Sequence, residues 1–345
     1  MRTVPLDAVQ TRADGVRGGA VPPVRPGASA AGRGWRTVLR TGAGAVLGLA
    51  LCYWLARQVD FGVLWSSLRD ANPWWVGAAL LSVAATVWVR AMRWRVLLAV
   101  EQPPQSSLLL CRWVAVGQVL NAVVPARAGE LARAYLGGAA GPAGKCFALG
   151  TVGAEKLVDL ALWTAMLLVA LVWFPMPPWV VHGAGVLLAV VAGLALGLWL
   201  LSRLFRSSLQ RALRERPWLR ARVEWVRAVW NGVLTLRRPG VVRQVLAWSV
   251  ALSVLYLVNN LAVFYALGVC GGVRDALVVL VILQVGIAPP STPAKVGVFE
   301  YLCVLSMGLL GFGQMTGMAY GVLLHVVVLL PPLVLVLLPI GRVAP

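Results

Sequence analysis

Apolar residues fill long runs along most of this chain, and short polar or proline-containing turns separate the runs. A helix of about 20 apolar residues is long enough to cross a hydrocarbon layer about 30 Å thick. The pattern therefore predicts an all-α, polytopic integral membrane protein with about six full spans. The spans are predicted at residues 37–55, 73–89, 148–174, 180–201, 245–267 and 317–338.

Two other apolar stretches, residues 107–136 and 275–310, are interrupted by prolines. The interruptions have nearly the same sequence, Pro125-Ala126-Arg127-Ala128-Gly129 and Pro293-Ala294-Lys295-Val296-Gly297. Neither half of such a stretch is long enough to cross the hydrocarbon layer by itself, so each stretch is predicted to form a re-entrant helical hairpin. Counted from a cytoplasmic N-terminus, the hairpins enter from opposite faces, which predicts an inverted repeat with a binding site at its interface.

The composition supports a membrane location. Hydrophobic residues make up 60% of the 345 residues, only 12% of the residues are charged, and the mean hydropathy is +0.81. In water, a fold of this composition would leave too much apolar surface exposed, which excludes an ordinary soluble protein.

The net charge of +19 comes mainly from arginines near the N-terminus and within residues 203–243. These clusters flank apolar spans, so the positive-inside rule explains them better than nucleic-acid binding. Residues 1–35 are predicted to form a disordered basic tail before a transmembrane domain at residues 36–345. Residues 203–243 are predicted to form a cytoplasmic amphipathic segment that either binds the anionic inner leaflet or only fixes the topology. Both termini are then cytoplasmic.

The third predicted span contains three charged residues, Glu155, Lys156 and Asp159. Glu155 and Asp159 are four residues apart and lie on one face of a helix, where they repel each other unless a cation lies nearby. The three residues either form a charged relay next to the hairpin tips or, for Glu155 and Lys156, extend to the cytoplasmic interface. The cations available in the interrupted stretches are Arg127, Arg133 and Lys295.

Arg93 and Trp94 belong to a basic and aromatic cluster at the end of the second predicted span. Such clusters are typical of the cytoplasmic interface of a membrane. Both side chains are therefore predicted to be interfacial.

No arrangement in the sequence is typical of an enzyme. The five cysteines are scattered singly, the two histidines are isolated, and no Ser/His/Asp grouping or phosphate-binding loop is present. We therefore expect no catalysis, no metal and no cofactor. A membrane-embedded transferase acting on a lipid-linked substrate and a non-transporting membrane scaffold remain alternatives to a transporter.

Four motifs carry most of the charge within apolar sequence. They are Arg93-Trp94, Asn121-x-x-x-Pro125-x-Arg127-x-Gly129-Glu130-x-x-Arg133, Glu155-Lys156-x-x-Asp159, and Pro293-x-Lys295-x-Gly297 with Glu300. Together they resemble the lysylphosphatidylglycerol synthase transmembrane region family, which includes the flippase half of the bacterial multiple peptide resistance factor. The resemblance covers nearly everything after the N-terminal tail. It implies a flippase-like protein of the bacterial inner membrane, and no aminoacyl-transferase activity is expected because no such domain follows the last span.

On this basis we expect the protein to translocate a phospholipid or a polyprenyl-phosphate-linked lipid through a polar groove. Arg127, Arg133 and Lys295 are expected to hold phosphate oxygens through charge-assisted hydrogen bonds. Glu130, Glu155 and Asp159 are expected to balance these cations when the groove is empty. The predicted substrate-binding set also includes Asn121, Lys156 and Glu300.

Overall fold

The computed structural model describes residues 61–124, 128–174, 178–207, 220–287 and 295–338. Every regular element in these ranges is helical, which confirms the predicted all-α class. Five helical stretches are long and apolar enough to cross a membrane, at Pro73–Leu98, Gly144–Trp173, Val180–Leu200, Pro239–Ala266 and Gln314–Leu337. They coincide with the predicted spans of the described ranges. The predicted tail and the predicted first span, at residues 1–35 and 37–55, lie outside these ranges.

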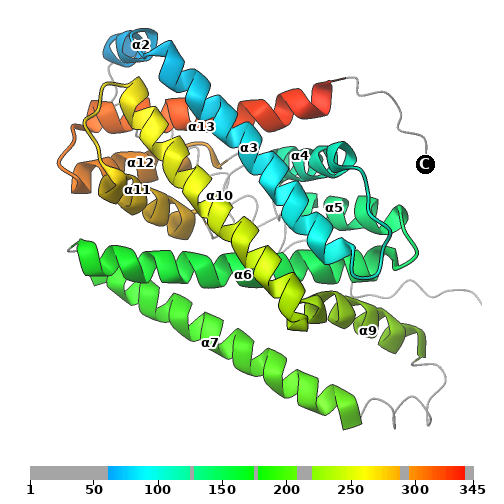
Figure 1. Cartoon of the computed structure of the whole chain (residues 1–345). Helices are drawn as coiled ribbons and strands as arrows, with labels where there is room; N and C mark the ends of the chain where they lie inside the picture. The colour runs from blue at the N-terminus through cyan, green and yellow to red at the C-terminus, as the bar shows by residue number, and fades with distance from the viewer. Residues whose placement is uncertain (1–60, 125–127, 175–177, 208–219, 288–294, 339–345) are drawn as a thin grey trace, which may run out of the picture. The chain divides into compact units, whose positions relative to one another are not determined.

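Two long helices, α3 (Pro73–Leu98) and α10 (Pro239–Ala266), cross each other and make the most extensive helix contact in the described chain (Figure 1). The backbone N–H of Asn72, just before α3, donates a hydrogen bond of 2.8 Å to the carbonyl of Ala266 at the end of α10. The beginning of one helix therefore lies beside the end of the other. The two helices run antiparallel.

The helix ends follow from the local sequence. Asn72 precedes Pro73, and its side-chain oxygen accepts a hydrogen bond of 3.0 Å from the N–H of Trp74, which caps α3. Ser106 caps the next helix in the same way by accepting a hydrogen bond of 3.3 Å from the N–H of Leu109. Proline begins both α3 and α10, at a position where a helix does not use the missing N–H.

Each of the two proline-interrupted stretches forms a pair of short helices. The first pair is α4 (Ser107–Val123) and α5 (Ala128–Ala139), and the second pair is α11 (Val273–Gly286) and α12 (Val298–Leu309). With a rise of about 1.5 Å per residue, these helices are about 18 to 26 Å long, shorter than a hydrocarbon layer of about 30 Å. The pairs of short helices agree with the predicted hairpins, whose depth in a membrane stays a prediction.

The two hairpins start from opposite ends of the crossed pair. The first hairpin follows the C-terminal end of α3, and the second follows the C-terminal end of α10 (Figure 1). Because α3 and α10 are antiparallel, these two C-terminal ends point in opposite directions. An inverted repeat requires this arrangement.

The helices that follow the hairpins, α6 (Gly144–Trp173) and α13 (Gln314–Leu337), each contact both repeats. α6 packs against α5 of its own repeat and against α11 of the other. In the same way, α13 packs against α12 of its own repeat and against α4 of the other. This reciprocal packing supports a repeat of four helices, α3 to α6 and α10 to α13.

The helices α2 (Phe61–Arg69) and α7 (Pro178–Ser207) lie outside these repeats and contact them from the side. α2 precedes α3 and contacts α13, and α7 packs along α6. Most side chains of α7 between residues 180 and 200 are exposed in the protein alone, as expected for a helix that faces lipid.

The helix α9 (Arg220–Leu234) is the described part of the predicted amphipathic segment. It crosses α6 so closely that a Cβ built at Gly150 would lie 2.0 Å from the carbonyl oxygen of Val229. The second half of α9 is therefore packed on protein, and contact of the segment with the anionic inner leaflet stays a prediction. Trp225 and Val226 in the first half are exposed.

Candidate functional site

Two carboxylates of α6, Glu155 and Asp159, face one arginine of α3. Nε of Arg93 lies 3.4 Å from Oε1 of Glu155, and its two Nη atoms lie 2.5 and 3.2 Å from the carboxylate oxygens of Asp159. The side chains of Arg93 and Glu155 are 2% and 1% exposed, whereas that of Asp159 is 23% exposed. The shared guanidinium offsets the repulsion between two carboxylates that lie one helical turn apart.

A second arginine, Arg133 of α5, contacts the same Glu155 from the hairpin. Its Nη2 donates to Oε2 of Glu155, and its guanidinium lies 4.7 Å from the centre of the Trp94 ring. Trp94 is held in turn by a hydrogen bond of 3.0 Å from its Nε1 to Oγ1 of Thr151. The buried Glu155 therefore joins the hairpin helix α5 to the long helix α3 through two arginines.

Helix α10 adds a hydroxyl to this group. Oγ of Ser249 accepts a hydrogen bond of 3.0 Å from Nη1 of Arg93 and donates one of 2.7 Å to the carbonyl of Val245. Helices from both repeats thus meet at one charged group. We refer to its four charged side chains as the ionic cluster, namely Arg93, Arg133, Glu155 and Asp159.

The hydrogen bonding of the ionic cluster is incomplete. Nε of Arg93, Nε of Arg133 and Oε1 of Glu155 are buried, and no atom in the described chain forms a hydrogen bond with them. Such groups are uncommon in folded proteins, because leaving a buried polar atom unpaired costs about 1–3 kcal/mol. Two of these atoms, Nε of Arg93 and Oε1 of Glu155, face each other at 3.4 Å, so their charges compensate each other without a hydrogen bond.

A more exposed ion pair borders the cluster. Nζ of Lys156 on α6 lies 2.8 Å from Oε1 of Glu130 on α5, and the two side chains are 40% and 23% exposed. Exposed pairs of this kind contribute little to stability, and they exchange partners more easily than buried ones.

The two helices of the first hairpin are in backbone contact. A Cβ built at Gly129 would lie 1.8 Å from the carbonyl oxygen of Gly117, so no larger residue fits there. Oδ1 of Asn121 on α4 accepts a hydrogen bond of 2.9 Å from the N–H of Gly129 on α5. Asn121 therefore fixes the geometry of the hairpin.

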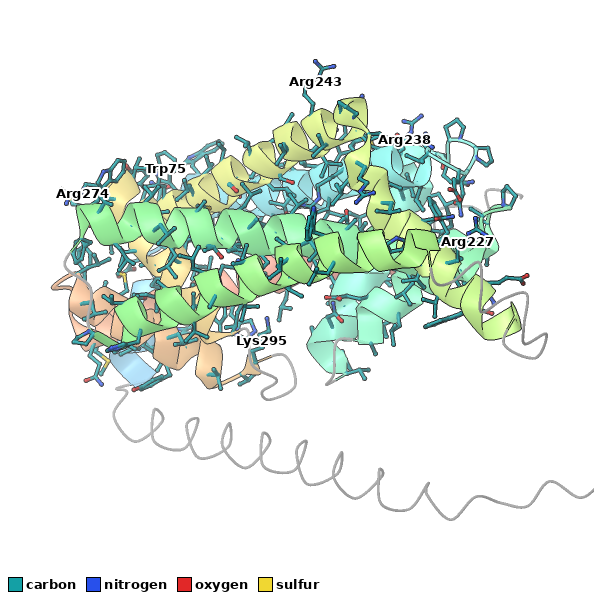
Figure 2. All side chains as sticks on the ribbon, turned by 90° about the horizontal axis from the view of Figure 1, so that it is seen from below. Trp75, Arg227, Arg238, Arg243, Arg274 and Lys295 are labelled. Atoms are coloured by element: carbon teal, nitrogen blue, oxygen red, sulfur yellow. The ribbon has the colours of Figure 1, made fainter. Side chains whose placement is uncertain are left out.

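In the second hairpin, Lys295 and Glu300 lie at the start of α12. Lys295 has a φ angle of 60°, a left-handed conformation that is uncommon for a residue with a side chain. Oε2 of Glu300 accepts a hydrogen bond of 2.7 Å from the N–H of Gly297, and Oε1 lies 2.5 Å from Nδ1 of His325 on α13. Glu300 therefore caps α12 and joins it to α13. Figure 2 shows Lys295 apart from the labelled arginines at either end.

Comparison with protein-family models identifies the family. Residues 42–335 match the lysylphosphatidylglycerol synthase TM region. The chain belongs to this family. The match includes both hairpins and the whole ionic cluster, so the protein is a multi-pass membrane protein of the lysylphosphatidylglycerol synthase TM region family. Comparisons with curated proteins and with solved structures gave no match.

In this member of the lysylphosphatidylglycerol synthase TM region family, part of the predicted site is brought together. Arg133, Glu155 and Asp159 lie in one cluster, and Glu130 and Lys156 form the pair beside it. Three other predicted residues lie elsewhere: Asn121 within the first hairpin, and Lys295 and Glu300 in the second. Arg127 lies outside the described residues.

Arg93 and Trp94, predicted to be interfacial, are buried among protein side chains, and their depth in a membrane stays a prediction. Carboxylates of α6 compensate the arginine, and Thr151 accepts from the indole. A signal for this was present in the sequence. Leu97 follows Arg93 by one turn and is buried against Val158 of α6, so the two residues share the face of α3 that meets α6.

Other contributors were missed because they belong to no motif. Ser249 of α10 and His325 of α13 lie in apolar runs, where a single polar residue is most simply a packing element. Their partners come from distant parts of the chain, so sequence spacing gives no indication of them.

Proposed function

We propose that the protein translocates a lipid with a phosphate-containing headgroup, a phospholipid or a polyprenyl-phosphate-linked lipid, across the bacterial inner membrane. The ionic cluster is the observation that supports this proposal most directly. Charges at this depth in apolar helices are costly by about 2.5–3.5 kcal/mol each on insertion scales. A protein retains such charges where a polar substrate must pass.

The mechanism follows from the contacts of Arg133. Its guanidinium is braced by the Trp94 ring and is paired with Glu155, which Arg93 also contacts. A phosphate oxygen arriving at Arg133 can replace Glu155 as acceptor, because Glu155 keeps Arg93 as its partner. In the empty site, the Glu155 carboxylate thus pairs with both arginines. When a headgroup binds Arg133, Glu155 releases Arg133 and stays paired with Arg93, so it does not become an unpaired buried charge. Lys295 of the second hairpin lies apart from the cluster and is a further cation on the proposed lipid path.

The distribution of basic residues supports an orientation of the protein in the membrane. Figure 2 shows Arg227, Arg238 and Arg243 at one end of the helices and Arg274, with Trp75, at the other. By the positive-inside rule, the end with the three arginines is cytoplasmic. The first hairpin then enters from the cytoplasmic side and the second from the outside, with both chain termini in the cytoplasm. The anionic inner leaflet is the proposed partner of the basic segment at residues 203–243.

Transport of a labelled phospholipid in proteoliposomes tests the proposal. We expect Arg133→Gln to fold, because Glu155 retains Arg93, and to translocate at least about tenfold more slowly, because a phosphate contact made through charge is lost. Arg133→Lys should be intermediate, since lysine keeps the charge but not the planar fork. Arg95→Gln is the matched control, as Arg95 donates to Ser107 away from the cluster and should leave the rate unchanged.

Wild-type translocation by the double variant Arg133→Gln, Lys295→Gln would reject this site as the lipid path. Mass spectrometry of the lipids before and after the assay separates transport from a transferase reaction. A transporter returns the lipid with its mass unchanged. A new product mass would favour an enzyme instead, and neither movement nor a product would favour a scaffold.

A further inference from the structure

One arginine of α3 lies beside the ionic cluster without a carboxylate of its own. Nε of Arg90 donates a hydrogen bond of 3.0 Å to the phenol oxygen of Tyr256 on α10, and Nη2 donates to the same oxygen. The guanidinium also lies 5.8 Å from the centre of the Tyr256 ring. In the part of the chain that the structure describes, Arg90 forms no ion pair.

This arginine gives the region an excess of positive charge. Among the described residues, Arg90, Arg93 and Arg133 share two carboxylates, Glu155 and Asp159. Asp159 attracts Arg90 through its charge, but its hydrogen bonds go to Arg93. The nearby pair of Lys156 with Glu130 is neutral and leaves the excess unchanged. A cation without a counter-ion inside an apolar helix is unfavourable, so a negatively charged partner is expected.

The surroundings of Arg90 are suited to a lipid. Arg90, Tyr256 and Trp163 of α6 each remain partly exposed, and the rings of Trp163 and Tyr256 stack with their centroids 5.6 Å apart. Charged N–H groups therefore lie next to partly exposed aromatic rings, inside the long helices rather than at their ends.

We propose that Arg90, Tyr256 and Trp163 form a binding site for the phosphate of an anionic membrane lipid. A guanidinium has five N–H groups in a planar fork, and Tyr256 accepts from only two of them. Tyr256 holds the guanidinium in place while the other N–H groups donate to phosphate oxygens. The role of the site in transport rests on the proposed function, but lipid binding itself does not.

Native mass spectrometry of the purified protein tests this site. The probes are three lipids with identical tails. Phosphatidylglycerol carries an anionic phosphate headgroup, phosphatidylcholine carries a zwitterionic phosphate headgroup, and diacylglycerol has no phosphate. The wild type should retain phosphatidylglycerol best, and Arg90→Gln should lower that retention by about tenfold, toward that of diacylglycerol. Arg95→Gln removes a cation from the same helix and should behave like the wild type. Retention by Arg90→Gln within about twofold of the wild type would overturn the proposal.

Two further variants separate charge from geometry. Arg90→Lys keeps the charge without the planar fork and should retain phosphatidylglycerol at an intermediate level. This variant also serves as the test if Arg90→Gln does not fold. Tyr256→Phe frees the guanidinium and should also weaken retention, whereas wild-type retention by both variants would count against the site. Glycerol 3-phosphate should not displace the lipid, and displacement by it would show that the site takes soluble phosphates instead.

The outcomes for this site and for transport are distinguishable. Loss of phosphatidylglycerol in Arg90→Gln, with no lipid movement by the wild type, would support the site and reject the proposed function. Active transport with unchanged retention in Arg90→Gln would reject the site and leave the proposed function standing.

Discussion

The two repeats have the same order of helices but are held together by different polar contacts. In the first repeat, α3 and α6 are joined by Arg93 with Glu155 and Asp159, all of them charged. At the corresponding place in the second repeat, α10 and α13 are joined by a neutral hydrogen bond from the phenol of Tyr320 to Oδ1 of Asn260. The contact between these two helices is thus charged in the first repeat and neutral in the second, where Glu300 instead contacts His325 between α12 and α13.

The apolar packing is more extensive in the second repeat than in the first. The largest buried apolar cluster of the described chain lies mainly in the second repeat, around Phe264, Met307 and Tyr320. In the first repeat, the buried Trp94 of the core cluster lies directly against the guanidinium of Arg133. The second repeat thus holds most of the largest apolar cluster, whereas the first holds the buried charges, whose cost the proposed function would explain.

The largest expected effect comes from neutralising the centre of the ionic cluster. Glu155→Gln leaves Arg93 and Arg133 buried with one carboxylate fewer, and we expect the free energy of unfolding to fall by about 3–5 kcal/mol. Reversible unfolding in mixed micelles measures this value. Asp159→Asn is the control and should cost less, because Asp159 is partly exposed. A loss below about 1 kcal/mol for Glu155→Gln would mean that the cluster does not organise the first repeat.

A smaller loss is expected from the neutral contact of the second repeat. Tyr320→Phe leaves the buried Oδ1 of Asn260 without its donor, which should cost about 1–3 kcal/mol of unfolding free energy. Lipid translocation should continue at the wild-type rate in the same proteoliposome assay. If Tyr320→Phe abolished translocation while folding was retained, the division of roles between the repeats would be wrong. Tyr265→Phe, at an exposed ring, serves as the control for the loss of a hydroxyl.

The cap of α12 should contribute somewhat less. Glu300→Ala removes the acceptor for the N–H of Gly297 and the partner of His325, and we expect a loss of about 0.5–2 kcal/mol. Glu300→Gln can still accept from Gly297 and should lose less than alanine does. Equal losses for the two variants would show that the charge opposite His325, rather than the cap, is what matters.

The smallest effect is expected at the edge of the first repeat. Lys156→Gln breaks an ion pair with Glu130 that is partly exposed, so the free energy of unfolding should change by less than about 1 kcal/mol. The same unfolding assay checks this value. A loss as large as that of Glu155→Gln would remove the distinction between buried and bordering charges.

The helices of this fold could be predicted from the sequence because their signals are local. Apolar runs long enough to span a membrane predicted the long helices, and the interruptions at Pro125 and Pro293 predicted the pairs of short helices. The partners within the site were harder to predict. Arg93 and Glu155 are far apart along the chain, and only the crossing of α3 with α6 brings them together. Arg93 resembles an interfacial anchor until its carboxylate partners are known.

The amphipathic segment shows a second limit of sequence patterns. Helical spacing correctly indicated a helix around Val226 and Val233, but an apolar stripe does not show whether its neighbour is lipid or protein. The deciding contact was between two glycines, Gly150 and Gly232, whose missing side chains let α6 and α9 meet at their backbones.

The contact of Gly117 with Gly129 limits how the first hairpin can move. With the carbonyl of one helix filling the place of a Cβ on the other, α4 and α5 cannot slide or rotate past each other without a collision. Any opening of this hairpin is therefore a rigid-body swing, with its hinges at the connections to α3 and α6, residues 99–106 and 140–143. Arg133 travels with that swing. The distance between Arg133 and Glu155 then changes with the angle between the hairpin and α6. A spin label on α5 paired with one on α6 would measure such a swing.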